Sequence, residues 1–386
     1  MAPGLRKRTV ALCGLGCIAP TVVAPPDRPL VVELIPVCHD TGNVLRMNGQ
    51  RMCISTVDYH TAGEPYRIVV GGVPILRGQT VLDKRADAER RLDDVRQLLC
   101  NEPRGHADMY GCFITPPDDE GAEFGMVFWH KDGFSTACGH GTIAGATWAL
   151  NHGLVSPIEP VTRFNLDVPS GRLAVEADVI DGRIGQVRFT NVAATVRRLD
   201  VPVLVAGDAI TVDVAYGGAH YAVLPAASVG LAVERANVGE LVRLGREIKA
   251  GLLGHSVTEH PSDERLSGLY GVIFFDEDPN PGSSGHVSDA ALAQRNITVF
   301  ADGEVDRSPC GSGTSARLAV LHDRRQLDIN DVLSHRGISG GLFSGRVLSA
   351  DSGEVITQVG GRASPTGFHT FVLEPDDELG LGFQLR

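Results

Sequence analysis

The sequence predicts an α/β (α+β) fold of two similar halves, each a curled, mostly antiparallel sheet around a central helix, with the functional site in the cleft between them. The first observation is a motif that occurs twice: Cys138–Ala144 and Cys310–Ala316 share Cys, Gly, Gly, Thr and Ala at the same offsets. The second is that a strand pattern precedes each copy and apolar residues at helical spacing follow it. The third is a series of short alternating strands after the first copy, which is typical of curled antiparallel sheet.

The duplicated motif also divides the chain. We expect the first half to consist of residues 47–195 plus 360–386, and the second half of residues 196–359, so that each half carries one copy of the motif. The crossing between the halves is expected at Val196–Asp200.

Residues 1–46 are predicted to be a disordered or non-native N-terminal extension, because they show no core pattern. A basic start and an apolar run at Thr9–Ala24 fit a signal peptide, but glycines interrupt the run and the Pro25-Pro26 pair is a poor cleavage site. The alternative interpretation is a misassigned start, with Met47 or Met52 nearer the true one.

The first half opens with two predicted strands, 53–57 and 66–70, joined by a polar turn. Asp58, His60 and Glu64 lie in this turn. We interpret them as side chains that hold the turn by hydrogen bonds to the backbone. The alternative is that His60 or Glu64 lines the functional site.

Hydrophobic periodicity predicts the remaining elements. An amphipathic helix is expected at Thr80–Leu99, and another helix within Val233–Leu253. Strands are expected at 110–115, 125–130, 163–168, 172–180, 184–192 and 296–300. His220 allows two interpretations, a contact with substrate or an ordinary packed and hydrogen-bonded position, and we favour the second. From its own stretch of sequence His106 is a loop histidine, and its role stays open.

Each copy of the motif places a cysteine at the start of a helix. The first N–H groups of a helix have no intrahelical partner, and the helix dipole adds a partial positive charge there. Both effects favour an anion and are expected to lower the pKa of a thiol from about 8.5 toward neutrality. Two such units facing each other would provide two thiols and two sets of backbone donors around one ligand, which suits moving a proton from one face of a carbon to the other.

The composition excludes several classes of function. The net charge of −12 argues against a nucleic-acid partner, since phosphate binding requires clustered Lys and Arg. No apolar run approaches the roughly 20 residues of a membrane-spanning helix. The cysteines show neither a disulfide framework nor the Cys-x-x-Cys spacing of a zinc site, so we expect no metal, free thiols and a cytoplasmic location. They are Cys13, Cys17, Cys38, Cys53, Cys100, Cys112, Cys138 and Cys310.

Four stretches of the chain resemble the proline racemase family, which includes hydroxyproline 2-epimerases and trans-3-hydroxyproline dehydratases. They are Asp58–Pro65, Glu102–His106, Cys138–Gly141 and Asp306–Thr314. The resemblance runs from about residue 50 to the C-terminus. It implies a diaminopimelate epimerase-like fold, a proline or hydroxyproline substrate, no cofactor and a homodimer.

The resemblance also implies a role for individual residues. Cys138 and Cys310 would be the acid/base pair that inverts Cα, one as thiolate and one as thiol. The substrate carboxylate would be bound chiefly by backbone N–H groups and the ring nitrogen by a carboxylate; these residues are Gly139, His140, Gly311 and Ser312 for the carboxylate and Asp306 for the nitrogen.

Two features of the chain favour different branches of the family. The stretches Glu102–Tyr110 and Tyr216–Tyr221 are most similar to the dehydratase branch, which usually carries Thr where this chain has Cys310. A dehydratase needs a base on only one face of the substrate, whereas inversion needs a second thiol, and Gly141 is more typical of the epimerases. We therefore favour the racemase or epimerase, with trans-3-hydroxy-L-proline dehydratase as the alternative.

Two other classes remain open. A thiol hydrolase could pair Cys138 with His140 or His106, but it needs one cysteine and leaves the repeat unexplained. A binding protein that kept the fold and lost the chemistry is disfavoured because both thiols are present.

Overall fold

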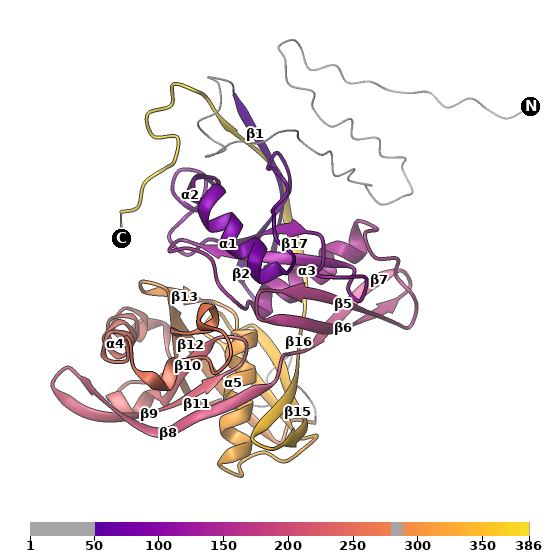
Figure 1. Ribbon diagram of the computed structural model, residues 1–386. Coiled ribbons are helices and arrows are strands. Elements are labelled where there is room, and N and C mark those ends of the chain that lie inside the picture. The colour runs from indigo at the N-terminus through magenta and orange to yellow at the C-terminus, as the bar shows by residue number, and fades with distance from the viewer. Residues whose placement is uncertain (1–50, 279–286, 288, 386) are drawn as a thin grey trace, which may run out of the picture.

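The computed structural model describes residues 51–278, 287 and 289–385. It confirms the predicted α+β class with two similar halves, each a curled sheet around one helix (Figure 1). The prediction for residues 1–46 lies outside the described residues.

The first half is a sheet in the order β17-β1-β2-β3-β4-β5-β6-β7. Its elements are β1 (Met52–Thr61), β2 (Glu64–Gly71), α1 (Val81–Arg91), α2 (Asp93–Cys100), β3 (Tyr110–Thr115), β4 (Phe124–His130), α3 (Gly139–Asn151), β5 (Val161–Val168), β6 (Gly171–Ile180), β7 (Arg183–Thr190) and, from the end of the chain, β17 (Ala363–Leu373).

The second half is a sheet in the order β8-β9-β10-β11-β12-β14-β15-β16, and β16 pairs back with β8. Its strands and α-helices are β8 (Ala194–Val205), β9 (Asp208–Tyr216), β10 (His220–Pro225), α4 (Val238–Gly251), β11 (Leu269–Glu277), β12 (Leu292–Phe300), β13 (Glu304–Asp306), α5 (Gly311–Asp323), β14 (Val332–Gly337), β15 (Leu342–Asp351) and β16 (Glu354–Gly361). Four short 3₁₀ helices, η2 (Ala226–Val229), η3 (Arg235–Asn237), η4 (Ser256–Thr258) and η5 (Glu264–Leu266), lie in its connections.

The two halves repeat one pairing pattern. In the first half β2–β3 is parallel, β3–β4 antiparallel and β4–β5 parallel, and in the second half β10–β11, β11–β12 and β12–β14 follow the same sequence. The chain passes between the halves twice, from β7 to β8 and from β16 to β17, and β16 pairs with both β7 and β8. We propose the boundaries of the halves at 195/196 and 359/360, which fall within the crossing strands β8 and β16.

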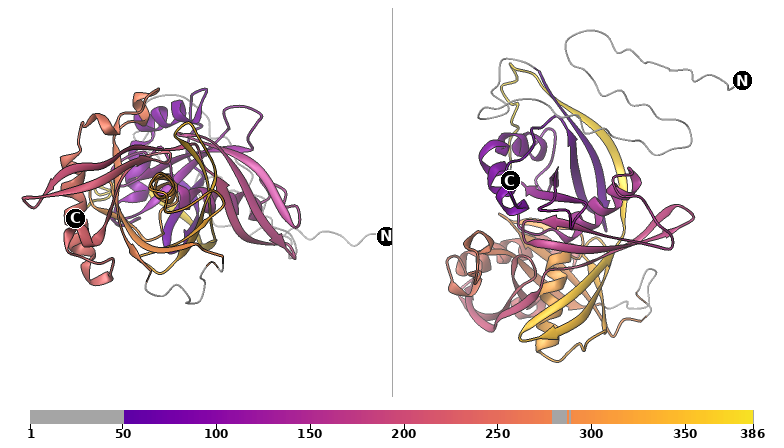
Figure 2. Two further views of the ribbon diagram at one scale, coloured as in Figure 1. Left: turned by 90° about the horizontal axis from the view of Figure 1, so that it is seen from below. Right: turned by 45° about the vertical axis from the view of Figure 1, so that its right-hand side comes forward.

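The central helices α3 and α5 are buried on all sides. Every residue of α3 from Gly139 to Leu150 is buried, and so is every residue of α5 from Gly311 to Leu321. A helix that is enclosed by a curled sheet has no solvated face, which explains why neither sequence shows a polar stripe. Viewed from below, α5 appears end-on inside its strands (Figure 2, left).

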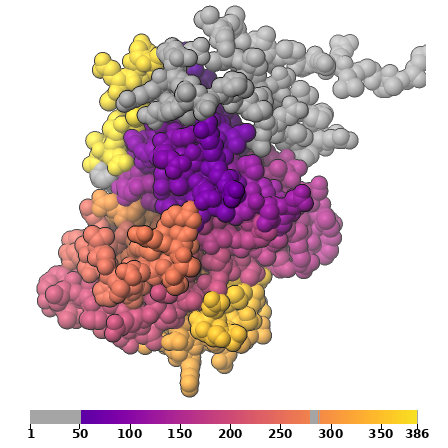
Figure 3. Space-filling model, in the orientation of Figure 1, coloured from indigo at the N-terminus to yellow at the C-terminus, as the bar shows by residue number. Residues whose placement is uncertain are grey.

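The halves meet along a seam visible on the molecular surface (Figure 3). Arg265 Nη1 of the second half lies 2.9 Å from Asp83 Oδ1 of the first. The N–H of Asp302 donates to Asp132 Oδ2, so the two turns that lead toward the duplicated cysteines are joined.

One predicted helix is divided in the structure. The expected helix at Thr80–Leu99 is two helices, α1 and α2, separated at Leu92, whose φ of −121° is not helical. Leu92 is fully buried, and the break allows both helices to pack apolar side chains against the sheet, where a single straight helix of this length would leave the sheet.

Candidate active site

The N-termini of α3 and α5 are in direct contact. A Cβ atom placed on Gly139 would overlap the Cα of Gly311, and a Cβ on Gly311 would lie 2.6 Å from the Cα of Gly139. Only glycine allows two backbones to approach this closely. The second residue of each motif is therefore required for the contact, and the unpaired N–H groups of both helices are brought to one place.

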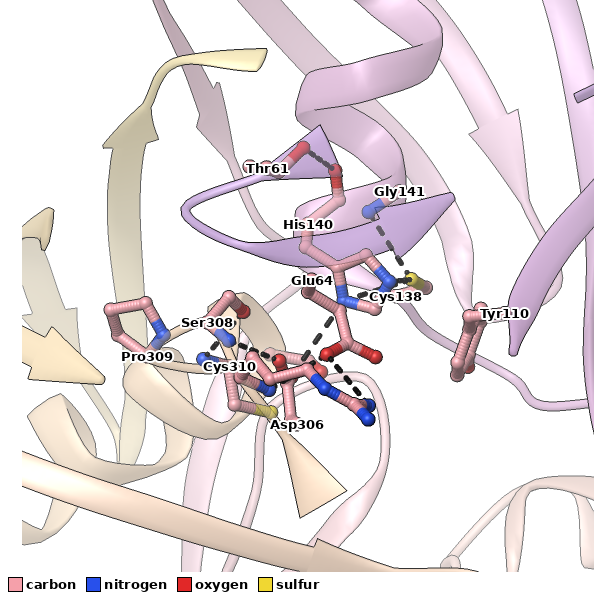
Figure 4. Close-up of polar contacts among 12 residues, drawn as sticks. Thr61, Glu64, Tyr110, Cys138, His140, Gly141, Asp306, Ser308, Pro309 and Cys310 are labelled. Carbon is pink, nitrogen blue, oxygen red and sulfur yellow. Dashed lines mark hydrogen bonds and ion pairs between the residues drawn. The ribbon is translucent and has the colours of Figure 1, made fainter. Parts of the chain in front are cut away.

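Cys138 adopts an extended N-cap conformation in front of α3, with φ −154° and ψ 101°. Its sulfur accepts the Gly141 N–H at 3.2 Å and lies 3.4 Å from His140 Nε2 (Figure 4). Its side chain is buried, with 5% exposure. The sequence prediction of a cysteine at this helix start is thus realised by a sulfur that caps the helix.

Cys310 precedes α5 in a different conformation. Its φ is +63°, a value that a residue with a side chain rarely adopts and that costs on the order of 1–3 kcal/mol. Its N–H donates to Ser308 Oγ at 3.1 Å, and its sulfur lies 3.6 Å from Tyr221 Oη. The strain is located on the residue that resemblance assigns to catalysis, where such strain is commonly found.

The expected lowering of the thiol pKa values is wrong for this structure. Burial raises the pKa of Cys138 well above its usual value, and the charges of Asp306, Cys310 and Glu64 add to the effect, although the hydrogen bond from Gly141 opposes it. Burial and then Asp306 raise the pKa of Cys310 to about 12. The helix N-termini are present, but desolvation and nearby carboxylates outweigh them.

Two buried carboxylates lie beside the thiols. Asp306 Oδ1 accepts the Ser308 N–H at 2.8 Å, and its Oδ2 lies 3.6 Å from His140 Nδ1 (Figure 4). Glu64 is fully buried and accepts the Arg307 N–H at 2.7 Å. Burial and then the charge of Asp306 raise the pKa of Glu64 well above its usual value. A cationic group placed here would be stabilised by both carboxylates.

The favoured sequence interpretation, that Glu64 only holds its own turn, is incomplete. His60, in the same turn, is exposed and accepts the Gly63 N–H, as the turn interpretation predicts. Glu64 instead contacts the backbone of Arg307 in the other half of the molecule, and its Oε1 has no hydrogen-bond partner among the described residues.

Aromatic residues near the thiols were also missed. Tyr221 Oη lies 2.6 Å from Ser312 Oγ, whereas the preceding His220 packs against Tyr216 at a ring distance of 4.9 Å. Consecutive strand residues face opposite sides, so His220 is packed away from the site, as favoured, while its neighbour faces the site. The expected hydrogen bonding of His220 is wrong, because neither ring nitrogen has a hydrogen-bond partner among the described residues. A signal was available: Tyr-Gly occurs at the start of both β3 and β11 as a second repeated pair.

Two residues of the Glu102–His106 stretch do not reach the site. Arg104 donates to the carbonyls of Val372 and Gly380 and pairs with Asp377, so it anchors the C-terminal segment. His106 Nδ1 accepts the N–H of Asp108. Among the described residues, His140 is therefore the histidine in contact with Cys138.

The remaining predicted binding residues are brought together with the thiols. Gly139, His140, Gly311 and Ser312 all lie in the first turns of α3 and α5. The described part of the chain holds no group of three or more His, Cys, Asp or Glu side chains arranged to bind a metal ion. Within the same residues, no helix has the length and apolar character needed to cross a membrane.

Comparison with known proteins now identifies the family. The family model described as proline racemase matches residues 56–384. A trans-3-hydroxy-L-proline dehydratase of Bacillus thuringiensis subsp. konkukian is 42% identical over 86% of this chain and 98% of its own length. A proline racemase of Acetoanaerobium sticklandii is 38% identical over the same shares of the two chains.

Solved structures agree with this assignment. A hydroxyproline epimerase from Agrobacterium vitis, with bound trans-4-OH-L-proline, superposes with a TM-score of 0.77 and 31% identity, and the match covers 86% of this chain and 96% of that one. Similarity of this extent covers both halves and both copies of the cysteine motif. This chain belongs to the proline racemase family.

Proposed function

We propose that this protein is a cofactor-independent racemase or epimerase that inverts the Cα of proline or a hydroxyproline, with Cys138 and Cys310 as its acid/base pair. The observation that carries the proposal is the contact between Gly139 and Gly311, because it brings two buried thiols, each in front of a central helix, to one site. Inversion requires a proton to leave one face of a carbon and another to arrive at the opposite face.

The proposed binding mode places the substrate carboxylate at the abutting helix N-termini. The backbone N–H groups of Gly139, His140, Gly311 and Ser312 would donate to it, and the positive ends of both helix dipoles would stabilise the charge that develops when Cα loses its proton. This stabilisation is needed because the Cα proton is far less acidic than a thiol.

Asp306 would bind the ring nitrogen of the substrate. Its Oδ2 lies on the side of His140, and the neighbouring Glu64 is buried. A secondary ammonium at this position would offset the charge of Asp306, which raises the pKa of both thiols, and that of Glu64, which raises the pKa of Cys138. Substrate binding would thereby favour formation of the thiolate that removes the Cα proton.

Isotope exchange tests the proposal. L-Proline and trans-4-hydroxy-L-proline incubated with the protein in deuterated water should gain deuterium at Cα and yield the epimer with the opposite Cα configuration. The reaction should proceed without added pyridoxal phosphate and survive dialysis against a chelator. Absence of exchange with every proline derivative would refute the racemase or epimerase assignment.

A second candidate is trans-3-hydroxy-L-proline dehydratase. It is favoured by the relative that is 42% identical and carries that name, and a dehydratase needs no second proton donor. In this case Cys138 alone would remove the Cα proton, and the 3-hydroxyl would leave with its bonding electrons to give a cyclic enamine. Rapid consumption of trans-3-hydroxy-L-proline with slow inversion of the other substrates would support it.

We also propose a homodimer in the cytoplasm. Five described cysteines are free thiols, which suits a reducing compartment. Strand β17 pairs with β1 alone among the described strands and exposes Phe368 and Val372, so a second copy could cover it. Sedimentation equilibrium of the full chain and of Phe368→Asp measures this directly, and a monomeric wild-type protein would refute the dimer.

A further inference from the structure

The backbone conformation of Cys310 affects more than its own side chain. Its φ of +63° sets the direction in which the preceding residues leave helix α5. Asp306, the residue proposed to bind the ring nitrogen, lies four positions earlier, at the end of strand β13. The position of the Cys310 sulfur relative to a substrate nitrogen held by Asp306 therefore depends on this backbone angle.

The surroundings of Cys310 must hold this angle. A positive φ on a residue with a side chain persists only where neighbouring groups prevent its relaxation. The carbonyl of Cys310 is held within α5 by the Thr314 N–H at 2.7 Å. Relaxation to a negative φ would therefore require rotation of the peptide group that joins Pro309 to Cys310, and the groups that bind this peptide maintain the strain.

Both polar ends of this peptide group are hydrogen-bonded. Its N–H donates to Ser308 Oγ at 3.1 Å (Figure 4), and its carbonyl oxygen, on Pro309, accepts the side-chain amide of Asn296 at 2.8 Å. Thr314 Oγ1 is a second and longer donor to the same oxygen, at 3.3 Å. Rotation of the peptide would break these bonds and leave a buried carbonyl without its partners.

Asn296 makes its contribution from inside the second half. It lies in the middle of strand β12 and is fully buried. Its Oδ1 has no hydrogen-bond partner among the described residues. A buried polar atom without a partner destabilises a fold, and an apolar side chain would avoid that penalty. The bond that Asn296 donates to Pro309, rather than its packing, therefore accounts for an amide at this position.

The strand beside Asn296 packs against the same turn. Gly337 of β14 is the neighbour of Asn296 in the sheet. A Cβ atom on Gly337 would lie 2.7 Å from the Ser308 carbonyl carbon and 2.9 Å from the Pro309 nitrogen. The turn before Cys310 thus rests on β14, while β12 supplies the side chain that holds its last carbonyl.

Cys138 needs no comparable support. Its φ of −154° is an ordinary extended value, and its sulfur accepts the Gly141 N–H from its own helix. Loss of the Asn296 amide is therefore expected to displace Cys310 and to leave Cys138 in place.

We propose that Asn296 is a positioning residue for Cys310: it holds the Pro309 carbonyl, so that the thiol keeps its place relative to Asp306 and the substrate. This inference rests on the proposed function, because it assigns Cys310 to one face of the substrate. It predicts a loss of activity that is confined to that face, which a residue with only a structural role would not produce.

The test follows loss of the Cα proton in deuterated water by NMR, separately for L-proline and D-proline and for trans-4-hydroxy-L-proline and its Cα epimer. Cys310→Ser identifies the configuration whose proton faces Cys310, because exchange of that configuration stops. In Asn296→Ala, exchange of the same configuration should fall by about 10- to 100-fold, since a displacement of about 1 Å reduces a rate by on the order of 100-fold. Exchange of the other configuration should stay within about threefold of wild type.

Asn101→Ala is the matched control. Asn101 is also a buried asparagine whose amide donates to a backbone carbonyl, that of Leu381 in the C-terminal segment. Its variant should exchange both configurations at the wild-type rate. Thr314→Val removes the longer bond to the Pro309 carbonyl with little change in volume, and it provides the same measurement if Asn296→Ala does not fold.

The outcomes separate the inference from the function on which it rests. A wild type that exchanges both configurations, with an Asn296→Ala variant that matches it or loses both equally, overturns the inference and leaves the racemase proposal standing. Selective loss of the configuration that faces Cys138 overturns it as well. A wild type that exchanges one configuration or neither leaves Cys310 without a proton to transfer, and refutes the inference together with the racemase proposal.

Discussion

The starts of α3 and α5 share a sequence motif but differ in conformation. Both helices are 13 residues long and follow a cysteine. Cys138 is extended and its sulfur caps its own helix, whereas Cys310 has a positive φ and makes no side-chain capping bond. The duplicated frame therefore presents two thiols with different local geometry, so the two faces of a bound substrate meet different chemical groups.

The neighbours of the two thiols differ as well. The residue after the glycine is His140 in the first copy and Ser312 in the second, and these contact Cys138 and Tyr221 respectively. Both thiols have raised pKa values, so they differ in their hydrogen-bond partners and in the action of Glu64, which raises the pKa of Cys138. We infer that the repeat conserves the position of the sulfur atoms and the helix dipoles, while each half supplies its own groups around them.

The largest expected effect comes from removing either thiol. Cys138→Ser and Cys310→Ser should each reduce inversion by about 10²–10⁴-fold, because a serine hydroxyl is too weakly acidic to replace a thiol as an acid/base group. Polarimetry of both enantiomers measures the loss. Each variant should still exchange the Cα proton of one enantiomer, the one whose Cα proton faces the remaining thiol, without inverting it. Equal loss of exchange from both enantiomers in both variants would contradict the assignment of one thiol to each face.

Cys310→Thr separates the two candidate functions. In a racemase or epimerase this change removes one proton donor and should abolish inversion, with a loss of similar size to that in Cys310→Ser. In a dehydratase it should leave consumption of trans-3-hydroxy-L-proline within about threefold of wild type, since Cys138 is the only base required. Product analysis of both reactions, for wild type and variant, decides between them: unchanged dehydration with no wild-type inversion would overturn the racemase proposal.

The sequence could predict the repeat but not everything around it. Cys138 and Cys310 stand in matching motifs at the helix starts, so their pairing followed from local pattern alone. Glu64, Tyr221 and Tyr270 lie on strands remote from the cysteines in the chain. Only the closure of each sheet and the contact between the halves bring them to the thiols, and no local periodicity reports such long-range contacts.

The raised thiol pKa values could not be predicted from the motif for a related reason. A helix N-terminus is visible in a sequence, whereas the burial of the sulfur and its distance from a carboxylate depend on tertiary packing. The charges of Asp306 and Glu64 raise the pKa of Cys138, and both residues belong to elements outside the Cys138 motif. Local sequence therefore indicated one contribution to the pKa and missed those that dominate.

Carboxylate variants test the electrostatic difference between the thiols. Asp306 raises the pKa of both cysteines, while Glu64 acts on Cys138. We expect Asp306→Asn to lower the pKa of both thiols, so that alkylation of each begins at lower pH, and Glu64→Gln to do so for Cys138 only. Peptide-resolved mass spectrometry after iodoacetamide treatment between about pH 7 and 11 measures both profiles in one experiment. The exposed Asp351→Asn is the control, and a Glu64→Gln variant that shifts both thiols equally would contradict the predicted difference.

The smallest expected effect concerns the turns that lead to the two cysteines. Glu304, on the Cys310 side, is 1% exposed and lies 3.9 Å from Lys131 on the Cys138 side. Burial and then the charge of Asp132 raise the pKa of Glu304 to about 9, so the folded protein retains a proton that the unfolded chain releases near pH 4.5. The contribution of Glu304 to the free energy of unfolding should therefore fall as the pH rises from about 4.5 to 9, because this group holds a proton in the folded state and not in the unfolded state throughout this range.

Glu304→Gln should remove this dependence, since glutamine keeps the shape of the protonated carboxyl group without its ionisation. A tenfold difference in proton affinity corresponds to about 1.4 kcal/mol, so the variant should be at least about 1 kcal/mol more stable than wild type near pH 8 and equally stable near pH 4. Thermal melts across this range measure it, with Glu240→Gln on the exposed face of α4 as a control that leaves the pH dependence intact. A variant less stable than wild type at pH 8 would show that Glu304 is ionised in the folded protein and that its pairing with Lys131 joins the two turns as a charged bridge. The two cysteine-bearing halves would then be held together by an ion pair, and the seam between them would strengthen, not weaken, as the pH rises.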